Sequence, residues 1–212
     1  MATLPDGQAD AVVTDPPYFL PAAHYNVRRK SARSLSDLSI LEHFFRGVFA
    51  ETRRVLAPAG FAYVFCDGQS YPAFYVAAYR HFRRMRPLVW DKQTSINGYA
   101  WRHQHELILF CESDASPHVK TGDGDVIRYR AVPIDERDHL AQKPVALLEH
   151  LIGKTTPSGG VVLDPFAGSG STLAAARELG YRAIGIEAEE SYCELAAHRL
   201  DALLDAGFEV AA

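Results

Sequence analysis

The stretch Asp-Pro-Pro-Tyr at residues 15–18 places an acid, two rigid backbone units and an aromatic ring directly after an apolar run. Residues 11–14 predict a strand, and two consecutive prolines cannot continue it in a sheet because they lack a backbone N–H. Asp15 offers a carboxylate and Pro16 a backbone carbonyl, and the prolines restrict the chain so that both acceptors have fixed positions. Acceptors held in this way suit the activation of an amine.

A second stretch, residues 161–187, has the order strand, acid, glycine loop, helix, strand, acid. Asp164 ends the first strand, and Gly168 and Gly170 permit positive φ and a close approach of the backbone to a ligand. Glu187 ends the next strand, where an acid can accept hydrogen bonds from ribose hydroxyls. The pattern predicts a nucleotide-like cofactor, although a glycine turn without a ligand is the simpler alternative.

The chemistry of the glycine loop separates two cofactor classes. A dinucleotide site requires a third glycine, but Leu173 stands at that position, and Asp164 would repel a pyrophosphate. S-adenosylmethionine carries a cationic amino group and no phosphate, so it suits Asp164 better. Beside such a cofactor, Asp15 and Pro16 can hold the two hydrogens of an exocyclic base amine, and Tyr18 can stack on a base removed from its helix. Taken alone, Asp-Pro-Pro is also typical of a rigid surface turn.

Strand and helix patterns alternate along the chain, which predicts an α/β sheet covered by helices. The strands are expected at residues 11–14, 61–66, 87–90, 105–112, 126–130, 161–164 and 181–187. The helices are expected from residue 39 to 56 and over 70–82, 143–156, 170–180 and 188–206. Residues 57–60 should end the first helix, and 93–103 should be a loop. One domain over 1–212 is the simplest account, with a mobile, DNA-facing loop at 19–38.

Composition limits the functional classes. The 212 residues carry a net charge of −4, so any contact with a polyanion must come from local patches. The three cysteines show no paired spacing and indicate reduced thiols. No apolar run is long enough to span a membrane and no signal peptide is evident, so we expect a cytoplasmic protein without membrane contact.

The sequence resembles the permuted (beta-type) DNA amino-methyltransferases, the N6-adenine and N4-cytosine DNA methylases, and in particular the phage- and prophage-like solitary DNA methylases. The motifs that carry the resemblance are TDPPY (14–18), LVWDK (88–92), HELILF (105–110), HLAQKP (139–144), DPFAGSGST (164–172) and GIEAEESYCELAAHRL (185–200). The resemblance implies a Rossmann-like S-adenosylmethionine-dependent methyltransferase fold, a mixed, mostly parallel twisted sheet with helices on both faces. It also implies methyl transfer to adenine N6 or cytosine N4. Aspartate at the first catalytic position favours adenine in that family, where serine favours cytosine.

The candidate site follows from these motifs. The catalytic residues are Asp15, Pro16, Pro17 and Tyr18, and no metal is expected. The cofactor-binding residues are Asp164, Pro165, Phe166, Ala167, Gly168, Ser169, Gly170, Thr172, Glu187 and Ala188, to which the resemblance adds His139 and Lys143. Leu140 and Ala141 replace a proline and a threonine of the family pattern. Family members also carry a strand before the stretch that begins here at residue 4, so the sheet is expected to lack one edge strand at the N-terminus.

Double-stranded DNA is the expected partner, and the resemblance makes a homodimer plausible. The DNA-binding candidates are Arg28, Arg29, Lys30 and Arg33 on the 19–38 loop, with Trp101 and Arg102 near the base. The alternative for the basic residues is a solvated loop, and the alternative for Trp101 and Arg102 is simple packing. The region 112–138, where target recognition is expected, is short.

Three functions therefore remain open. The first is an enzyme that methylates the exocyclic amine of a flipped base, with adenine N6 favoured over cytosine N4. The second is a truncated, non-catalytic relative that binds DNA or a partner. The third is a nicotinamide-dependent oxidoreductase, against which both Leu173 and Asp164 argue.

Overall fold

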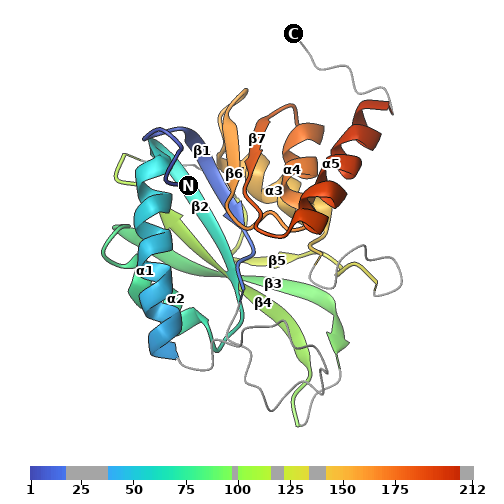
Figure 1. Cartoon of the computed structure of the whole chain (residues 1–212). Helices are drawn as coiled ribbons and strands as arrows, with labels where there is room; N and C mark the ends of the chain where they lie inside the picture. The colour runs from blue at the N-terminus through green and yellow to red at the C-terminus, as the bar shows by residue number, and fades with distance from the viewer. Residues whose placement is uncertain (18–37, 97–99, 116–121, 134–141, 206–212) are drawn as a thin grey trace.

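The alternating segments fold into one seven-stranded sheet with the strand order β5-β3-β4-β2-β1-β6-β7 (Figure 1). The computed structural model describes residues 1–17, 38–96, 100–115, 122–133 and 142–205. The strands are β1 (Ala9–Thr14), β2 (Leu56–Cys66), β3 (Arg84–Ile96), β4 (His103–Glu112), β5 (Val126–Arg128), β6 (Val161–Asp164) and β7 (Arg182–Gly185). The pairs β1–β2, β1–β6, β6–β7 and β3–β5 are parallel, whereas β4 runs antiparallel to β2 and β3. The predicted mixed, mostly parallel α/β sheet is confirmed.

Helices cover both faces of the sheet. They are α1 (Leu38–Val55), α2 (Tyr71–Ala78), α3 (Val145–Thr155), α4 (Ser171–Glu178) and α5 (Glu190–Asp205). One apolar cluster joins α1 and α2 to one face, and a second joins α3 and α4 to the other. Strand β2 serves both clusters, because successive side chains of a strand point to opposite faces. Thus Phe61, Tyr63 and Phe65 pack on the α3 side, and Ala62, Val64 and Cys66 on the α1 side.

Several predicted boundaries are wrong, most clearly at three places. Residues 57–60 do not separate α1 from the next strand but belong to β2. The pairing of β1 with β2 shifts register between Ala9 and Ala11, and this irregularity accommodates Pro58 and Gly60 within the strand. The second helix ends at Ala78 instead of residue 82. Strand β3 continues to Ile96 into the predicted loop: its pairing with β4 shifts register after Asp91 and resumes at Ile96, opposite His103, which a local pattern does not reveal.

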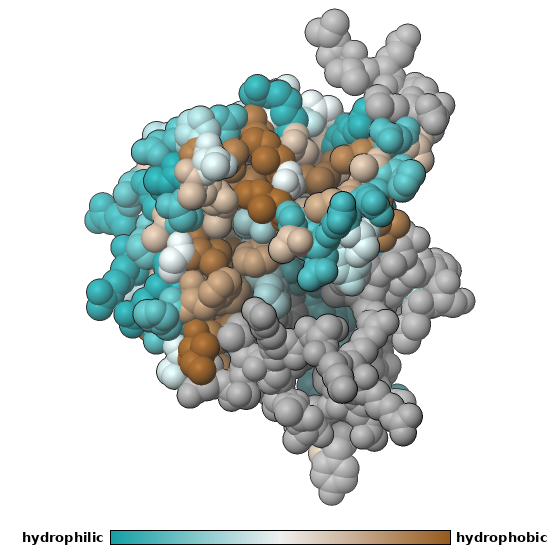
Figure 2. All heavy atoms as spheres, in the orientation of Figure 1, coloured by the Kyte–Doolittle hydropathy of each residue, from teal (hydrophilic) through white to brown (hydrophobic). Residues whose placement is uncertain are grey.

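The two edges of the sheet are formed by β5 and β7. Strand β5 lies within the region 112–138 expected for target recognition, and it pairs in parallel with β3 at one edge. Strand β7 forms the other edge, with Ala183 and Gly185 exposed; within the described residues no strand lies beyond it. Apolar residues gather on the surface between α1 and α5, over β6 and β7 (Figure 2). Across the described part of the chain, no helix is both long and apolar enough to cross a bilayer.

Candidate active site

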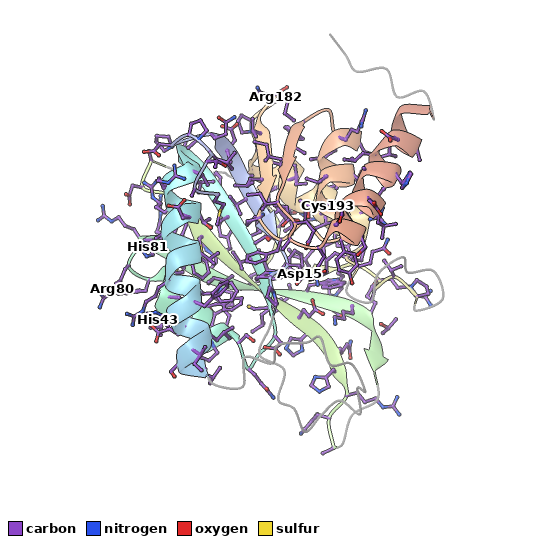
Figure 3. The ribbon with its side chains drawn as sticks, viewed as in Figure 1. Asp15, His43, Arg80, His81, Arg182 and Cys193 are labelled. Atoms are coloured by element: carbon purple, nitrogen blue, oxygen red, sulfur yellow. The ribbon has the colours of Figure 1, made fainter. Side chains whose placement is uncertain are left out.

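The two stretches with candidate chemistry lie side by side because β1 and β6 are neighbouring parallel strands. Ala11 pairs with Val162 and Val12 with Leu163, so both strands deliver their next residues to the same edge of the sheet. The chain continues from β1 into α1 on one face and from β6 into α4 on the other. Such a switch point, at the carboxyl ends of the strands, is where open α/β sheets bind ligands. Asp15 lies at this edge, near the middle of the molecule (Figure 3).

A buried hydrogen bond ties the two stretches together. The hydroxyl of Thr14 donates to Asp164 Oδ1 over 2.6 Å, and the backbone N–H of Phe166 donates to the same oxygen over 3.1 Å. Asp164 is only 3% exposed. Burial raises the pKa of Asp164 to about 6, against the lowering effect of hydrogen bonds from Thr14, Thr172 and Phe166. Asp164 therefore lies beneath the glycine loop with protein partners, and its predicted contact with a cofactor amino group stays a prediction.

The glycine loop, residues 165–170, depends on backbone conformations that other residues rarely adopt. Gly168 and Gly170 have φ angles of +51° and +80°. A Cβ on Gly170 would lie 2.8 Å from the Cβ of Ala196, so this glycine also permits the contact with α5. A Cβ on Gly168 would meet no heavy atom within 4 Å, because the backbone there faces open space. The loop is thus packed on one side and accessible on the other.

Glu187 holds the loop through its carboxylate. Its Oε2 accepts the N–H of Gly168 over 2.8 Å, and its Oε1 accepts the N–H groups of Ala188 and Glu189 over 2.8 and 3.0 Å. The carboxylate therefore also lies at the start of α5, where the helix dipole favours a negative charge. The predicted hydrogen bonds to ribose hydroxyls would have to share these oxygens, and that role stays a prediction.

Arg199 of α5 is a site residue that the sequence reasoning missed. Its guanidinium donates to the hydroxyls of Ser171 over 2.8 Å and Ser169 over 3.5 Å. The last helix thereby braces the glycine loop from behind. The signal was present in the motif at 185–200, which contains Arg199, but spacing alone did not indicate its partner.

Lys143 lies against Asp15, the predicted catalytic acid. Its ammonium group forms ion pairs with Asp15 and, over 3.3 Å, with Glu106, and Glu106 pairs over 2.5 Å with Lys92. Burial raises the pKa of Glu106, but the two lysines outweigh it and hold that pKa below its usual value. Burial lowers the pKa of Lys143, and Asp15 and Glu106 together hold it above its usual value. Sequence reasoning assigned Lys143 to the cofactor and gave Glu106 and Lys92 no role.

The other predicted site residues are distributed unevenly. Pro16, Pro165, Ala167, Ser169 and Thr172 are buried, whereas Pro17 and Ala188 are exposed. Trp101 is 87% exposed and stands with exposed Arg102 just before β4, on the β3–β4 hairpin that projects beyond the sheet (Figure 1). Tyr18, His139 and the basic residues Arg28, Arg29, Lys30 and Arg33 lie outside the described residues.

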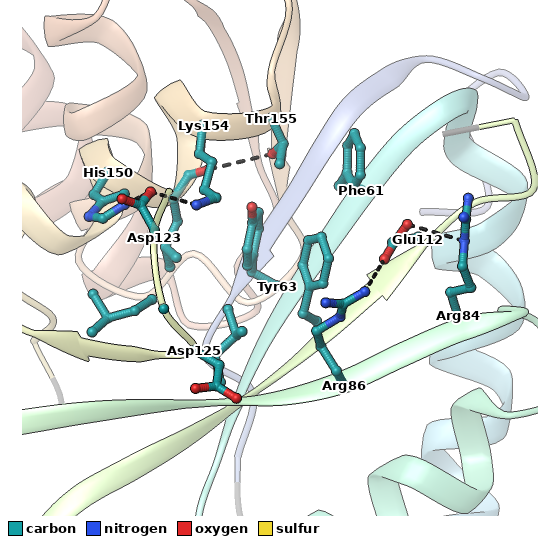
Figure 4. A pocket seen from close by; sticks show the side chains of 15 residues that line it. Phe61, Tyr63, Arg84, Arg86, Glu112, Asp123, Asp125, His150, Lys154 and Thr155 are labelled. Carbon is teal, nitrogen blue, oxygen red and sulfur yellow. Dashed lines mark hydrogen bonds and ion pairs between the residues drawn. The ribbon is translucent and has the colours of Figure 1, made fainter. Parts of the chain in front are cut away.

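A separate hollow of about 490 Å³ lies between α3 and strands β2, β3 and β4 (Figure 4). Its floor includes Phe61, Tyr63 and Phe110, and its rim includes Arg86 and Lys154. No predicted site residue lines it. Elsewhere in the described residues, no group of three or more His, Cys, Asp or Glu side chains is arranged to hold a metal ion.

Comparison with known proteins agrees with this geometry. The N6/N4 DNA methylase family model matches residues 9–198. YubD of Escherichia coli K12, a relative named as a methylase, is 33% identical over 207 residues, which cover 96% of this chain and 86% of YubD. The type II methyltransferase M.HinfI of Haemophilus influenzae is 26% identical over 234 residues, covering 94% of this chain and 65% of its own length.

The fold is also found in a solved structure. TTHA0409 of Thermus thermophilus, a protein named as a DNA modification methylase and solved in complex with S-adenosyl-L-methionine, superposes with a TM-score of 0.73 at 23% identity. The match covers 95% of this chain and 88% of TTHA0409. Since the family model spans most of the sequence, and the chain segments that follow β1 and β6 meet at one sheet edge, the chain belongs to the N6-adenine/N4-cytosine family of DNA methylases.

Proposed function

We propose that this protein transfers a methyl group from S-adenosylmethionine to the exocyclic amine of a base in double-stranded DNA, with adenine N6 as the acceptor. The observation that carries the proposal is the hydrogen bond between Thr14 and Asp164, because it fixes the strand that ends in Asp15 against the strand that opens the glycine loop. A donor of methyl groups and an acceptor amine can therefore approach each other at a single sheet edge.

The glycine loop fits the adenosyl cofactor. Its backbone at Gly168 faces open space, and Glu187 is half-buried beside it. When bound, the cofactor supplies an electrophilic methyl group. The loop residues 165–170, with Glu187 and Ala188, orient it, and Asp164 and Arg199 hold the loop from below and behind.

The acceptor amine is positioned by the catalytic stretch. The Asp15 carboxylate and the Pro16 carbonyl accept hydrogen bonds from its two N–H groups, so that the lone pair is directed toward the methyl group. The base must leave the duplex to reach this edge, and Tyr18 is the proposed stacking partner. The transfer is direct and requires no nucleophilic side chain.

DNA contacts are assigned to two segments. The β3–β4 hairpin presents Trp101, whose exposed ring suits stacking on a base, and Arg102 beside it. The basic residues 28–33 are proposed to contact phosphates, which would make binding depend on salt. A homodimer stays a prediction that light scattering can test.

Adenine is supported by the aspartate at the first position of the catalytic stretch, since in the resembling family serine accompanies cytosine. The test is expression in cells that lack endogenous DNA methylases, followed by mass spectrometry of the hydrolysed nucleosides. We expect N6-methyladenine. Finding N4-methylcytosine instead would overturn the choice of base, and finding no methylated nucleoside would favour the non-catalytic alternative, which calorimetry with S-adenosylmethionine would then examine.

A further inference from the structure

Four motifs that are distant in the sequence contribute one charged side chain each to a single, partly buried chain of ion pairs. Lys92 pairs with Glu106 Oε1 over 2.5 Å, Glu106 Oε2 lies 3.3 Å from the Lys143 ammonium, and Lys143 pairs with Asp15. We call these four residues the charge chain. Only Asp15 has an assigned role in the reaction, so the purpose of the other three is open.

The charge chain is shielded from water. The side chains of Lys143, Lys92, Glu106 and Asp15 are 8%, 11%, 19% and 22% exposed, so the catalytic acid is the most accessible member. Aromatic rings lie against both cations: the Lys143 ammonium is 5.1 Å from the centre of the Phe65 ring, and that of Lys92 is 5.3 Å from the Trp90 ring. The signs alternate along the chain and sum to zero, which is the arrangement that low-dielectric surroundings tolerate.

Stability alone is a weak reason to bury such a chain, because apolar residues of similar volume often serve a core equally well or better. The contact between Glu106 and Lys143 supports another reason. Glu106 Oε2 is buried, and the Lys143 ammonium 3.3 Å away is the cation that it faces. Glu106 thus acts on Lys143 through its charge and position, and Lys143 acts directly on Asp15 Oδ2.

We propose that Lys143, held in place by Glu106 and Lys92, is a positioning residue that orients the Asp15 carboxylate toward the acceptor amine. This inference rests on the proposed function. By binding Oδ2, Lys143 sets the direction of Oδ1, and Glu106 keeps the ammonium group from turning toward solvent or cofactor. The family resemblance instead assigns Lys143 to cofactor binding, and the two roles predict different losses.

The decisive variant is Glu106→Gln, which keeps the volume of the side chain but removes its charge. In single-turnover assays with saturating cofactor and DNA, we expect its rate of methyl transfer to fall at least tenfold, while the Kd for S-adenosylmethionine changes less than threefold. Lys92→Met removes a charge one ion pair further from Asp15, so its rate of methyl transfer should fall less, about threefold. Glu106→Asp should recover part of the lost rate. Glu42→Gln, which removes an exposed ion pair with Arg46 on α1, is the matched control and should turn over at the wild-type rate.

Two results would overturn the inference. One is a wild-type rate in Glu106→Gln. The other is a rate loss in that variant that more cofactor restores, since this would make the charge chain part of the cofactor site. If the wild-type protein itself methylates no DNA, the proposed function fails and the positioning role fails with it.

A second measurement examines the charge chain without turnover. Asp15 and Glu106 share Lys143 as a partner, so removing both leaves a buried ammonium without either carboxylate. In urea unfolding, Asp15→Asn with Glu106→Gln should raise the unfolding constant at least fivefold beyond the product of the single effects. Effects that simply multiply would refute the coupling through Lys143, whether or not the protein is active.

Discussion

The proposed cofactor half and the proposed catalytic half of the site are built in different ways. The cofactor half comes from one continuous segment, residues 161–199, and is held by glycine conformations, the Glu187 carboxylate on backbone N–H groups, and the Arg199 contacts. The catalytic half collects charged side chains from four separate segments. A continuous loop depends on backbone shape, so it should be most sensitive to added volume. A set of buried charges depends on balance, so it should be most sensitive to the loss of one charge.

The largest effect is expected at the exposed end of the catalytic half. Asp15→Ala should lower methyl transfer by about 10³-fold, because it removes an acceptor for the amine at the reacting centre. The Kd for S-adenosylmethionine should change only a few-fold, since Asp164 and the glycine loop remain. Radiolabelled methyl incorporation and calorimetry measure the two quantities. Asp114→Ala, at an exposed ion pair with Arg53, is the control. Methyl transfer that survives Asp15→Ala would contradict the assignment of Asp15 to the reacting centre.

Added volume should damage the cofactor half, and two glycines make a matched pair. Gly170→Ala would combine a φ of +80° with a Cβ 2.8 Å from that of Ala196, and should cost about 3 kcal/mol of unfolding free energy. Gly168→Ala has a φ of +51°, and its new Cβ would meet no heavy atom within 4 Å, so it should cost about 1 kcal/mol of unfolding free energy. Urea unfolding measures both. Equal losses would show that backbone strain, and not the contact with α5, dominates at Gly170.

The pH dependence of stability should reveal the buried acid between the halves. Asp164 has a pKa of about 6 in the folded protein and 3.8 as its reference value. Between these values the folded state holds a proton that the unfolded state has lost, so stability falls as the pH rises through this window. The difference amounts to about 3 kcal/mol above pH 6. Asp164→Asn lacks this titration, so its stability relative to wild type should rise between pH 4 and 7 in denaturant titrations. Parallel curves for the two proteins would contradict the raised pKa.

The smallest effect is expected outside both halves, on the β3–β4 hairpin. Trp101→Ala should leave the unfolding free energy within about 0.5 kcal/mol, because the ring is 87% exposed. If the ring stacks on a base, DNA affinity should fall about tenfold. Fluorescence anisotropy with labelled duplex DNA measures the affinity. An unchanged Kd would assign DNA contact to other segments, and a loss of stability would identify Trp101 as a packing residue.

The elements that were predicted in the right order share one property: local spacing determines their position. The glycine loop and its flanking strands were predicted in the right order because strand, loop and helix follow one another within 161–187. The boundary errors at β2 and β3 arose where strand pairing overrides the local pattern. Pro58 and Gly60 are typical of a break between elements, yet the shifted register of β1 and β2 accommodates both within β2.

The amino-acid sequence by itself determined the α/β class, the Asp-Pro-Pro-Tyr stretch at a strand end and the glycine loop that follows β6, because each is encoded by neighbours along the chain. Only the tertiary structure decided that Thr14 hydrogen-bonds to Asp164, that Arg199 braces the loop, and that Lys143 joins Asp15 to Glu106. These partners are far apart in the sequence, and their pairing depends on the strand order of the sheet. Their hydrogen bonds and ion pairs form only when that order brings the partner side chains together.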